Sequence, residues 1–251
     1  MDNLLPGFQH SEIYAFLVLL TVCATQLGYL LISGKNVNSP VLDYSISAER
    51  YQMKRFLRLK LLGFMLFGII PFVLFYLLFV PDHYFVEPIS STWQIPDFLL
   101  AALPALIILL NFFAAGKKDF YDRFPQMRIT EWGIPHLLIS IMGWGIYLLG
   151  YEYLFRGLFL SAWLEAFGPV TAIVANVLVY SLFHIPNGKN EAIGAIPFGI
   201  ILCLLTLQSG TFVPALLLHW VLSVSAEMFS VYHHPEMQFK LKKIYLWKSI
   251  S

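Results

Sequence analysis

The stretch from residue 134 to residue 163 reads IPHLLISIMGWGIYLLGYEYLFRGLFLSAW, and it decides the fold class. Residues 134–151 contain no Asp, Glu, Lys or Arg, and the apolar run continues to Trp163 with one acid and one base. A helix needs about 20 mostly apolar residues to cross the hydrocarbon core of a bilayer. The stretch is therefore typical of a membrane-spanning helix, and it lacks the polar face of a soluble surface helix.

Six further stretches have the same character, although two of them are short. They cover residues 13–32, 61–80, 98–115, 170–183, 192–207 and 212–231. Hydrophobic residues make up 58 % of the 251 residues and charged residues 12 %, which is too few charges to cover a soluble domain of this size. We expect an all-α fold, a polytopic transmembrane helical bundle of about seven spans, with eight as the upper count.

The basic residues predict the orientation of these spans. Fifteen of the 16 Lys and Arg residues fall in alternate loops or in the tail, in the ranges 35–60, 117–128, 189 and 240–248. The positive-inside rule then places the N-terminus outside and the C-terminus in the cytoplasm. Residues 47–60 mix charges with apolar side chains and predict an interfacial helix on the cytoplasmic face. The net charge of +1, with no basic stripe, gives no indication of a nucleic-acid partner; the lipid bilayer is the expected solvent.

The sixteenth basic residue is Arg156, which lies inside an apolar run four residues after Glu152. Residues four apart lie on one face of a helix, so the two charges are placed to form an ion pair. A lone charge at the middle of the bilayer costs about 2.5–3.5 kcal/mol on insertion scales. Two interpretations follow: the pair locks the packing of the helix, or it belongs to a functional site.

Two histidines in other apolar stretches favour the functional interpretation. His184 ends the fifth stretch, and His219 lies in the seventh stretch four residues before Ser223. Each histidine alone is typical of a packed or helix-terminal residue. Glu227 shares a helix face with His219, and we expect it to be a helix-end carboxylate that reaches water. The two cysteines, Cys23 and Cys203, are expected to be small packing residues.

A carboxylate and two imidazoles inside a membrane form a set that could hydrolyse a peptide bond. Glu152 could take a proton from water, and His184 could share that task or protonate the leaving amine. His219, with Ser223 one turn further on, could donate to a developing oxyanion. The same Glu152, His184 and His219 could instead hold Zn²⁺ with an open position, and the residue types do not choose between these versions.

Three motifs on separate stretches resemble the CPBP family of intramembrane proteases, which includes type II CAAX prenyl endopeptidases and bacteriocin-related Abi proteins. The first is Tyr151-Glu152-x-x-x-Arg156, the second Tyr180-x-x-x-His184 and the third His219-x-x-x-Ser223. The family pattern begins with two glutamates, and its first glutamate is usually given the role of base. Tyr151 stands at that position here, and Ser223 stands where the family has Asn or Asp.

The resemblance implies an intramembrane endopeptidase, with Glu/His-activated water or zinc, that cleaves a membrane-embedded or membrane-tethered peptide or protein. It implies catalytic roles for Glu152, Arg156, His184, His219 and Ser223, with Tyr151 and Tyr180 lining the site. A bacterial plasma membrane is the expected location. The alternative is a catalytically degenerate homologue that acts as an immunity or interaction protein; a solute transporter is disfavoured because no internal repeat is present.

The same resemblance divides the chain into three predicted regions. Residues 1–125 hold the N-terminal spans and the interfacial segment, residues 126–235 form the catalytic-type helical core, and residues 236–251 form a basic cytoplasmic tail. One geometric difficulty follows from the predicted spans. Glu152 lies near the outer end of a helix that begins at residue 134, whereas His184 lies near the cytoplasmic end of the next helix.

Overall fold

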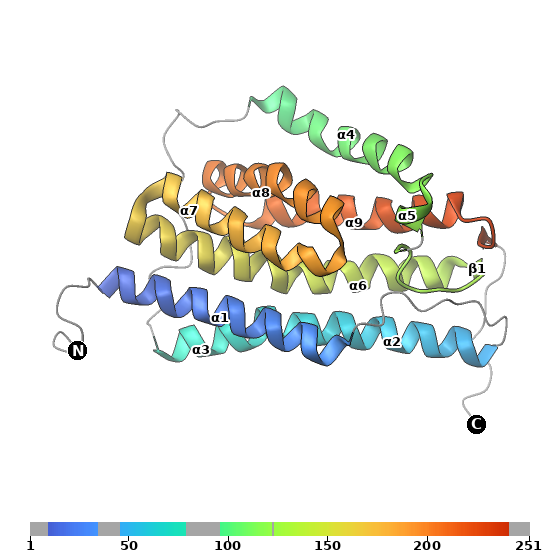
Figure 1. Cartoon of the computed structure of the whole chain (residues 1–251), viewed down its shortest axis with the longest axis horizontal. Helices are drawn as coiled ribbons and strands as arrows, with labels where there is room; N and C mark the ends of the chain where they lie inside the picture. The colour runs from blue at the N-terminus through green and yellow to red at the C-terminus, as the bar shows by residue number, and fades with distance from the viewer. Residues whose placement is uncertain (1–9, 35–45, 79–95, 122, 241–251) are drawn as a thin grey trace. The chain divides into compact units, whose positions relative to one another are not determined.

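A computed structural model describes residues 10–34, 46–78, 96–121 and 123–240, and these residues are almost entirely helical. The elements, drawn in Figure 1, are α1 (His10–Ser33), α2 (Ile46–Phe64), η2 (Met65–Ile69), α3 (Ile70–Leu78), α4 (Asp97–Ala115), α5 (Lys118–Tyr121), β1 (Glu131–Trp132), α6 (Ile134–Glu152), η4 (Tyr153–Phe159), α7 (Leu160–His184), η5 (Ile185–Asn187), α8 (Lys189–Ser209), α9 (Val213–His233) and β2 (Gln238–Phe239).

Six helical segments among the described residues are long and apolar enough to cross a bilayer. They are Ser11–Ser33, Ser47–Leu77, Asp97–Ala115, Ile134–Asn187, Lys189–Ser209 and Val213–His233. Their outward side chains are apolar: Leu31, Leu77 and Phe98 are each more than 70 % exposed, as expected for side chains that face lipid. The chain is an all-α polytopic membrane protein, as predicted.

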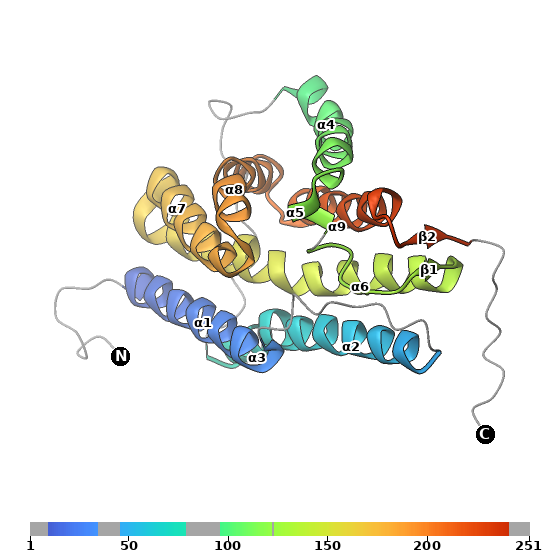
Figure 2. The ribbon, with the colours of Figure 1, turned by 45° about the vertical axis from the view of Figure 1, so that its right-hand side comes forward.

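Two of the predicted spans are arms of one long segment. Helical structure continues from Ile134 to His184, except at Gly168, whose φ of +78° and ψ of 172° lie outside the helical region. Proline follows at position 169, so the first arm ends at Gly168 and a second arm returns to His184. Figures 1 and 2 both show α7 folding back, so that its second half runs beside η4 and α8.

The predicted interfacial helix is not separate from the span that follows it. Residues 46–78 form one helical segment in which α2 passes through the π-helical turn η2 into α3. A segment of this length measures about 48 Å at 1.5 Å per residue, which exceeds the hydrocarbon core of about 30 Å. The charged residues of α2 therefore lie on the same continuous helix as the apolar span, and not on a separate surface helix.

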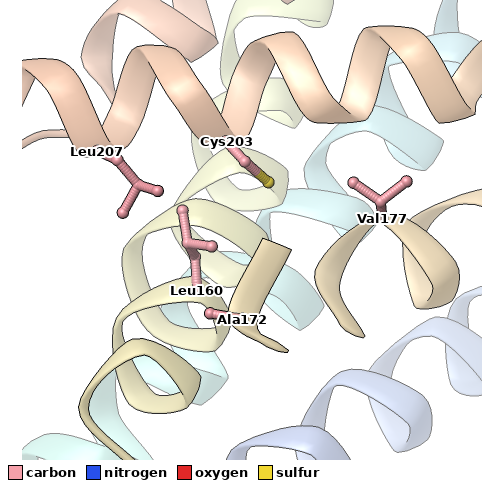
Figure 3. Packing of buried hydrophobic residues seen from close by; sticks show 5 residues of the cluster. All are labelled: Leu160, Ala172, Val177, Cys203 and Leu207. Carbon is pink, nitrogen blue, oxygen red and sulfur yellow. The ribbon is translucent and has the colours of Figure 1, made fainter. Parts of the chain in front are cut away.

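The chain divides into two compact units that interleave along the sequence. The first contains residues 1–29, 65–96 and 149–217, and the second contains residues 30–64, 97–148 and 218–251. In the first unit, α1 joins the first arm of the hairpin, because the indole Nε1–H of Trp163 donates to the carbonyl of Ala15 at 3.2 Å. Figure 3 shows Cys203 and Leu207 of α8 directed towards Leu160, Ala172 and Val177, which form the buried core of this unit.

The second unit buries two charged residues, Lys60 and Glu227. Lys60 is 2 % exposed, and its Nζ lies 2.9 Å from the ring centroid of Trp144, with Tyr147 and Phe56 at about 5 Å. Glu227 is fully buried, and its Oε1 accepts the backbone N–H of Gln126 at 2.9 Å. The prediction of a solvated helix-end carboxylate is therefore wrong. The attraction between the two charges, with the polar groups around them in the same unit, offsets part of the cost of removing both from water.

A short pair of parallel strands, β1 and β2, lies in the second unit. β1 pairs with β2 through Glu131 opposite Gln238 and Trp132 opposite Phe239. The start of α6 is held to α2 in the same unit, because His136 Nε2 lies 2.9 Å from the Glu49 carboxylate. The Nδ1 atom of His136 accepts the N–H of Gly133 at 3.0 Å, so the hydrogen of the neutral ring is on Nε2 and points to Glu49.

Candidate active site

The hairpin brings the first two sequence motifs to the same level. Glu152 precedes the break at Gly168 by 16 residues, and His184 follows it by 16 residues (168 − 152 and 184 − 168). The two arms are in register, because Arg156 and Tyr180, each four residues nearer the turn, are in contact. The geometric difficulty in the predicted spans disappears, because the first arm runs on to Gly168 and Glu152 is in its middle.

A π-helical turn holds the arginine of the first motif. η4 covers Tyr153–Phe159 and begins directly after Glu152, and Arg156 is at its centre. Both charged residues are fully buried, with Arg156 Nη1 3.2 Å from Glu152 Oε2. The i, i+4 pairing expected from the sequence is therefore present. A π-turn inserts extra backbone into a helix, and such turns are frequent at functional sites.

Tyr180 is the common contact of the two motifs. The guanidinium carbon of Arg156 lies 4.4 Å from the centroid of the Tyr180 ring. The ring of His184 lies 4.4 Å from the same centroid, and Tyr151 approaches it edge-on at 6.1 Å. A cation over an aromatic face is stabilised by the ring quadrupole, and more strongly where water is excluded. Tyr180 thus partly replaces the hydration that Arg156 loses.

The tautomer of His184 follows from its hydrogen bond. Its Nδ1 lies 2.8 Å from the backbone carbonyl oxygen of Tyr180. A carbonyl oxygen only accepts, so Nδ1 carries the hydrogen, and Nε2 is the ring nitrogen able to take up a proton. His184 is half-buried at the end of α7, where the helix passes into η5. This is the arrangement that a general base or a proton shuttle requires.

Tyr151, at the position of the family's first glutamate, is part of an aromatic cluster. Its ring is 5 % exposed, stacks on Phe155 at 4.8 Å and meets Phe67 of η2 edge-on at 5.6 Å. The neighbouring Glu152 faces Arg156 instead. Glu152 is therefore the carboxylate that pairs with Arg156, and Tyr151 packs beside Tyr180.

The third motif lies on α9 in the second unit. His219 is 7 % exposed and Ser223 is 6 % exposed, so both side chains are buried. They are four residues apart and share one face of the helix. The first unit brings together Tyr151, Glu152, Arg156, Tyr180 and His184; His219 and Ser223 belong to the other unit, and their predicted roles stay predictions.

Asn176 is a residue of this site that the sequence reasoning missed. It is fully buried on α7, and its Nδ2 donates to the backbone carbonyl of Phe155 at 2.7 Å. Its Oδ1 accepts from the thiol of Cys203 at 3.4 Å. A signal was available, because Asn176, Tyr180 and His184 are spaced four residues apart and share one helix face.

The three predicted zinc ligands are divided between the two units. Within the described residues, neither unit gathers three His, Cys, Asp or Glu side chains in an arrangement that could hold a metal ion. Glu152 and His184 belong to the first unit and His219 to the second, so the zinc site stays a prediction.

The family match covers the part of the chain that carries all three motifs. Residues 129–236 match the family described as type II CAAX prenyl endopeptidase Rce1-like. This segment is similar to the Rce1-like family and is called the Rce1-like region from here on. The resemblance drawn from the three motifs is thereby confirmed, and the Rce1-like region includes every predicted site residue from Tyr151 to Ser223. No curated protein and no solved structure gives a significant match to the sequence.

Proposed function

We propose that the protein is an intramembrane endopeptidase that hydrolyses a peptide bond of a membrane-associated protein or peptide. The observation that carries this proposal is the buried Glu152–Arg156 pair, joined through Tyr180 to His184 inside an Rce1-like region. Intramembrane ionisable residues are functional candidates by default. Here a carboxylate, a guanidinium and an imidazole are held on adjacent arms of one hairpin.

In the proposed reaction, Glu152 accepts a proton from a water molecule while the water oxygen attacks the carbonyl carbon of the scissile bond. The carbonyl π electrons move to oxygen and give a tetrahedral oxyanion. When this collapses, the C–N bond breaks, and the leaving nitrogen takes the proton from Glu152 or from His184. Arg156 keeps the carboxylate oriented, and His219 with Ser223 donates hydrogen bonds to the oxyanion.

The substrate is proposed to be a peptide that is embedded in the bilayer or tethered to it. Most outward side chains of the spans are apolar, so a substrate that shares the bilayer reaches the protein without leaving lipid. The proposed orientation places the C-terminus in the cytoplasm, which follows from the distribution of Lys and Arg.

The alternative function is that of a catalytically degenerate homologue, which keeps the fold and acts through binding. The observation that favours it is Tyr151, which fills an aromatic cluster where the family pattern has a glutamate. In this alternative, the Glu152–Arg156 ion pair would only stabilise the packing of η4 and would take no part in a reaction.

The experiment that separates the two is cleavage of a membrane-tethered reporter peptide in proteoliposomes. We expect wild type to cleave it, with losses of about 100-fold or more in Glu152→Gln and in His219→Ala. Glu165→Gln is the matched control, because Glu165 is an exposed acid on α7. Equal cleavage by wild type, Glu152→Gln and His219→Ala would remove the proposed mechanism. If wild type cleaves no reporter and Glu152→Gln keeps full biological function in cells, the alternative would be established.

A further inference from the structure

The π-helical turn that carries Arg156 has an unusual hydrogen-bond acceptor. The carbonyl oxygen of Phe155 accepts the backbone N–H of Leu160, five residues on, and also the Nδ2–H of Asn176 at 2.7 Å. A carbonyl oxygen has two lone pairs, so both bonds are satisfied at once. The second bond comes from the opposite arm of the hairpin.

Asn176 links three elements at the centre of the first unit. It lies on α7, donates to η4 and accepts from the thiol of Cys203 on α8. The side chain is fully buried, so its amide would lose both hydrogen bonds without gaining water if the arms shifted. Tyr180 and His184 follow it at successive turns of the same helix face, so a bond at Asn176 fixes the position of both.

We propose that Asn176 is the positioning residue of the site: its amide holds the π-turn of η4 and thereby sets Glu152 and Arg156 against Tyr180 and His184. An isolated π-turn has poorer hydrogen-bond geometry than an α-helix, so it needs a partner that favours the displaced carbonyl. Without that partner, the segment relaxes to α-helix. The π-turn holds one residue more than the α-helical turn would, and each residue of a helix corresponds to a rotation of about 100°. Glu152 precedes the turn, so the relaxation would rotate it away from Tyr180 and His184.

The activity test rests on the proposed endopeptidase function. Asn176→Leu keeps the number and branching of the side-chain heavy atoms and removes both hydrogen bonds, and Asn176→Ala is the second variant if the bulkier leucine prevents folding. We expect kcat to fall by at least about 100-fold, because a misplacement of only about 1 Å already has that effect and the expected rotation is larger, while KM stays within about twofold. The control is Ser181→Ala, which removes a 2.7 Å bond from Ser181 Oγ to the Ala192 carbonyl without touching η4.

A distance test stands independently of the activity. Spin labels at Leu149, before the π-turn, and at Val174, on the returning arm, use side chains that are 41 % and 61 % exposed. The background carries Cys23→Ser and Cys203→Ser. We expect the label separation to change by up to about 8 Å in the Asn176 variants, as the helix radius implies for a rotation of about 100°, and to stay unchanged in Ser181→Ala.

The two tests together leave no neutral outcome. A changed label separation with a lowered kcat supports the proposal. A changed separation in a protein that cleaves no reporter, wild type included, supports the positioning role and removes the proposed function. An unchanged separation in both Asn176 variants overturns the positioning role, whatever the activity. A loss of kcat in Ser181→Ala equal to that in Asn176→Leu also overturns it, because the loss of any side-chain bond from α7 would then have the same effect.

Discussion

Arg156 is stabilised in an environment that has no bulk water. Glu152 neutralises its charge at 3.2 Å, and the face of Tyr180 lies 4.4 Å from its guanidinium carbon. Part of its hydrogen-bonding capacity remains unused among the described residues. A buried pair of this kind contributes little net stability compared with apolar residues of the same volume, but the removal of one partner is costly because the other is left charged and buried.

The first prediction concerns this pair. Arg156→Leu leaves the Glu152 carboxylate buried without its counter-charge, and we expect a loss of about 3–5 kcal/mol in the free energy of unfolding. The double variant Glu152→Gln/Arg156→Leu removes both charges and should recover a large part of that loss. Reversible unfolding in detergent measures both quantities. If the double variant is as unstable as Arg156→Leu, the pair is not the reason for the instability.

A second prediction concerns the space behind Tyr180. A Cβ atom added at Gly199 of α8 would lie 3.1 Å from Tyr180 Cδ1, whereas one added at Gly194 of the same helix meets nothing within 4 Å. We expect Gly199→Ala to lower stability by about 1–3 kcal/mol through overpacking and to reduce cleavage by displacing Tyr180. Gly194→Ala should instead gain about 0.5–1 kcal/mol from helix propensity. Thermal unfolding of the two variants makes the comparison, and equal shifts would contradict it.

Individual residues were predictable where a local rule applied and unpredictable where a distant contact decided. The Glu152–Arg156 pairing follows from their spacing on a helix and is present. The sequence predicts Glu227 to reach water and Lys60 to end an interfacial helix, yet partners from remote parts of the second unit bury both. The hydrogen bond from Asn176 to the Phe155 carbonyl could not be predicted, because nothing in the sequence around Asn176 indicates which distant backbone group it contacts.

The hairpin of η4 and α7 is the element that positions the candidate site, and Gly168 is its turn. Its φ of +78° and ψ of 172° belong to a region that is essentially restricted to glycine. A Cβ atom at this position would meet nothing within 4 Å, so any cost of a larger residue arises from the backbone alone. The following proline cannot donate the hydrogen bond that would continue the helix.

The third prediction tests this turn. Gly168→Ala should lower the free energy of unfolding by about 1–3 kcal/mol because of the backbone conformation alone. Gly28→Ala on α1 is the matched control, since its added Cβ also meets nothing within 4 Å and its φ is not positive. Chemical denaturation in detergent distinguishes the two. A loss in Gly28→Ala as large as that in Gly168→Ala would show that backbone strain at the turn is not the cause.

The helices were easier to predict than their ends. All seven apolar stretches are helical within the described residues, because continuous apolarity in lipid leaves the helix as the only way to satisfy the backbone. The ends were misplaced where charged or polar residues interrupt the apolar run, as at Lys60 and at Glu152. Hydropathy reports mean apolarity and not hydrogen bonding, so it could not show that α2 continues through η2, or that η4 is a π-turn.

At the scale of the whole molecule, the distribution of charge predicts the topology. Lys117 lies in the described connection after α4, and Ser209 ends α8; both are exposed and on opposite sides of the predicted arrangement. In a Cys23→Ser/Cys203→Ser background, a membrane-impermeant maleimide added to intact cells should label Ser209→Cys and not Lys117→Cys. Permeabilised cells should give labelling of both. The reverse pattern in intact cells would invert the predicted orientation.

The equal arm lengths on either side of Gly168 also constrain how the sequence can change in length. Loss of one residue from one arm would displace the acid from the imidazole by about 1.5 Å along the helix axis and about 100° around it. Loss of one residue from each arm would shorten the hairpin but leave the two groups level. Insertions and deletions between residues 152 and 184 should therefore be poorly tolerated even as pairs, because a change on each side of the glycine keeps the two groups level but rotates each of them by about 100° around its own helix.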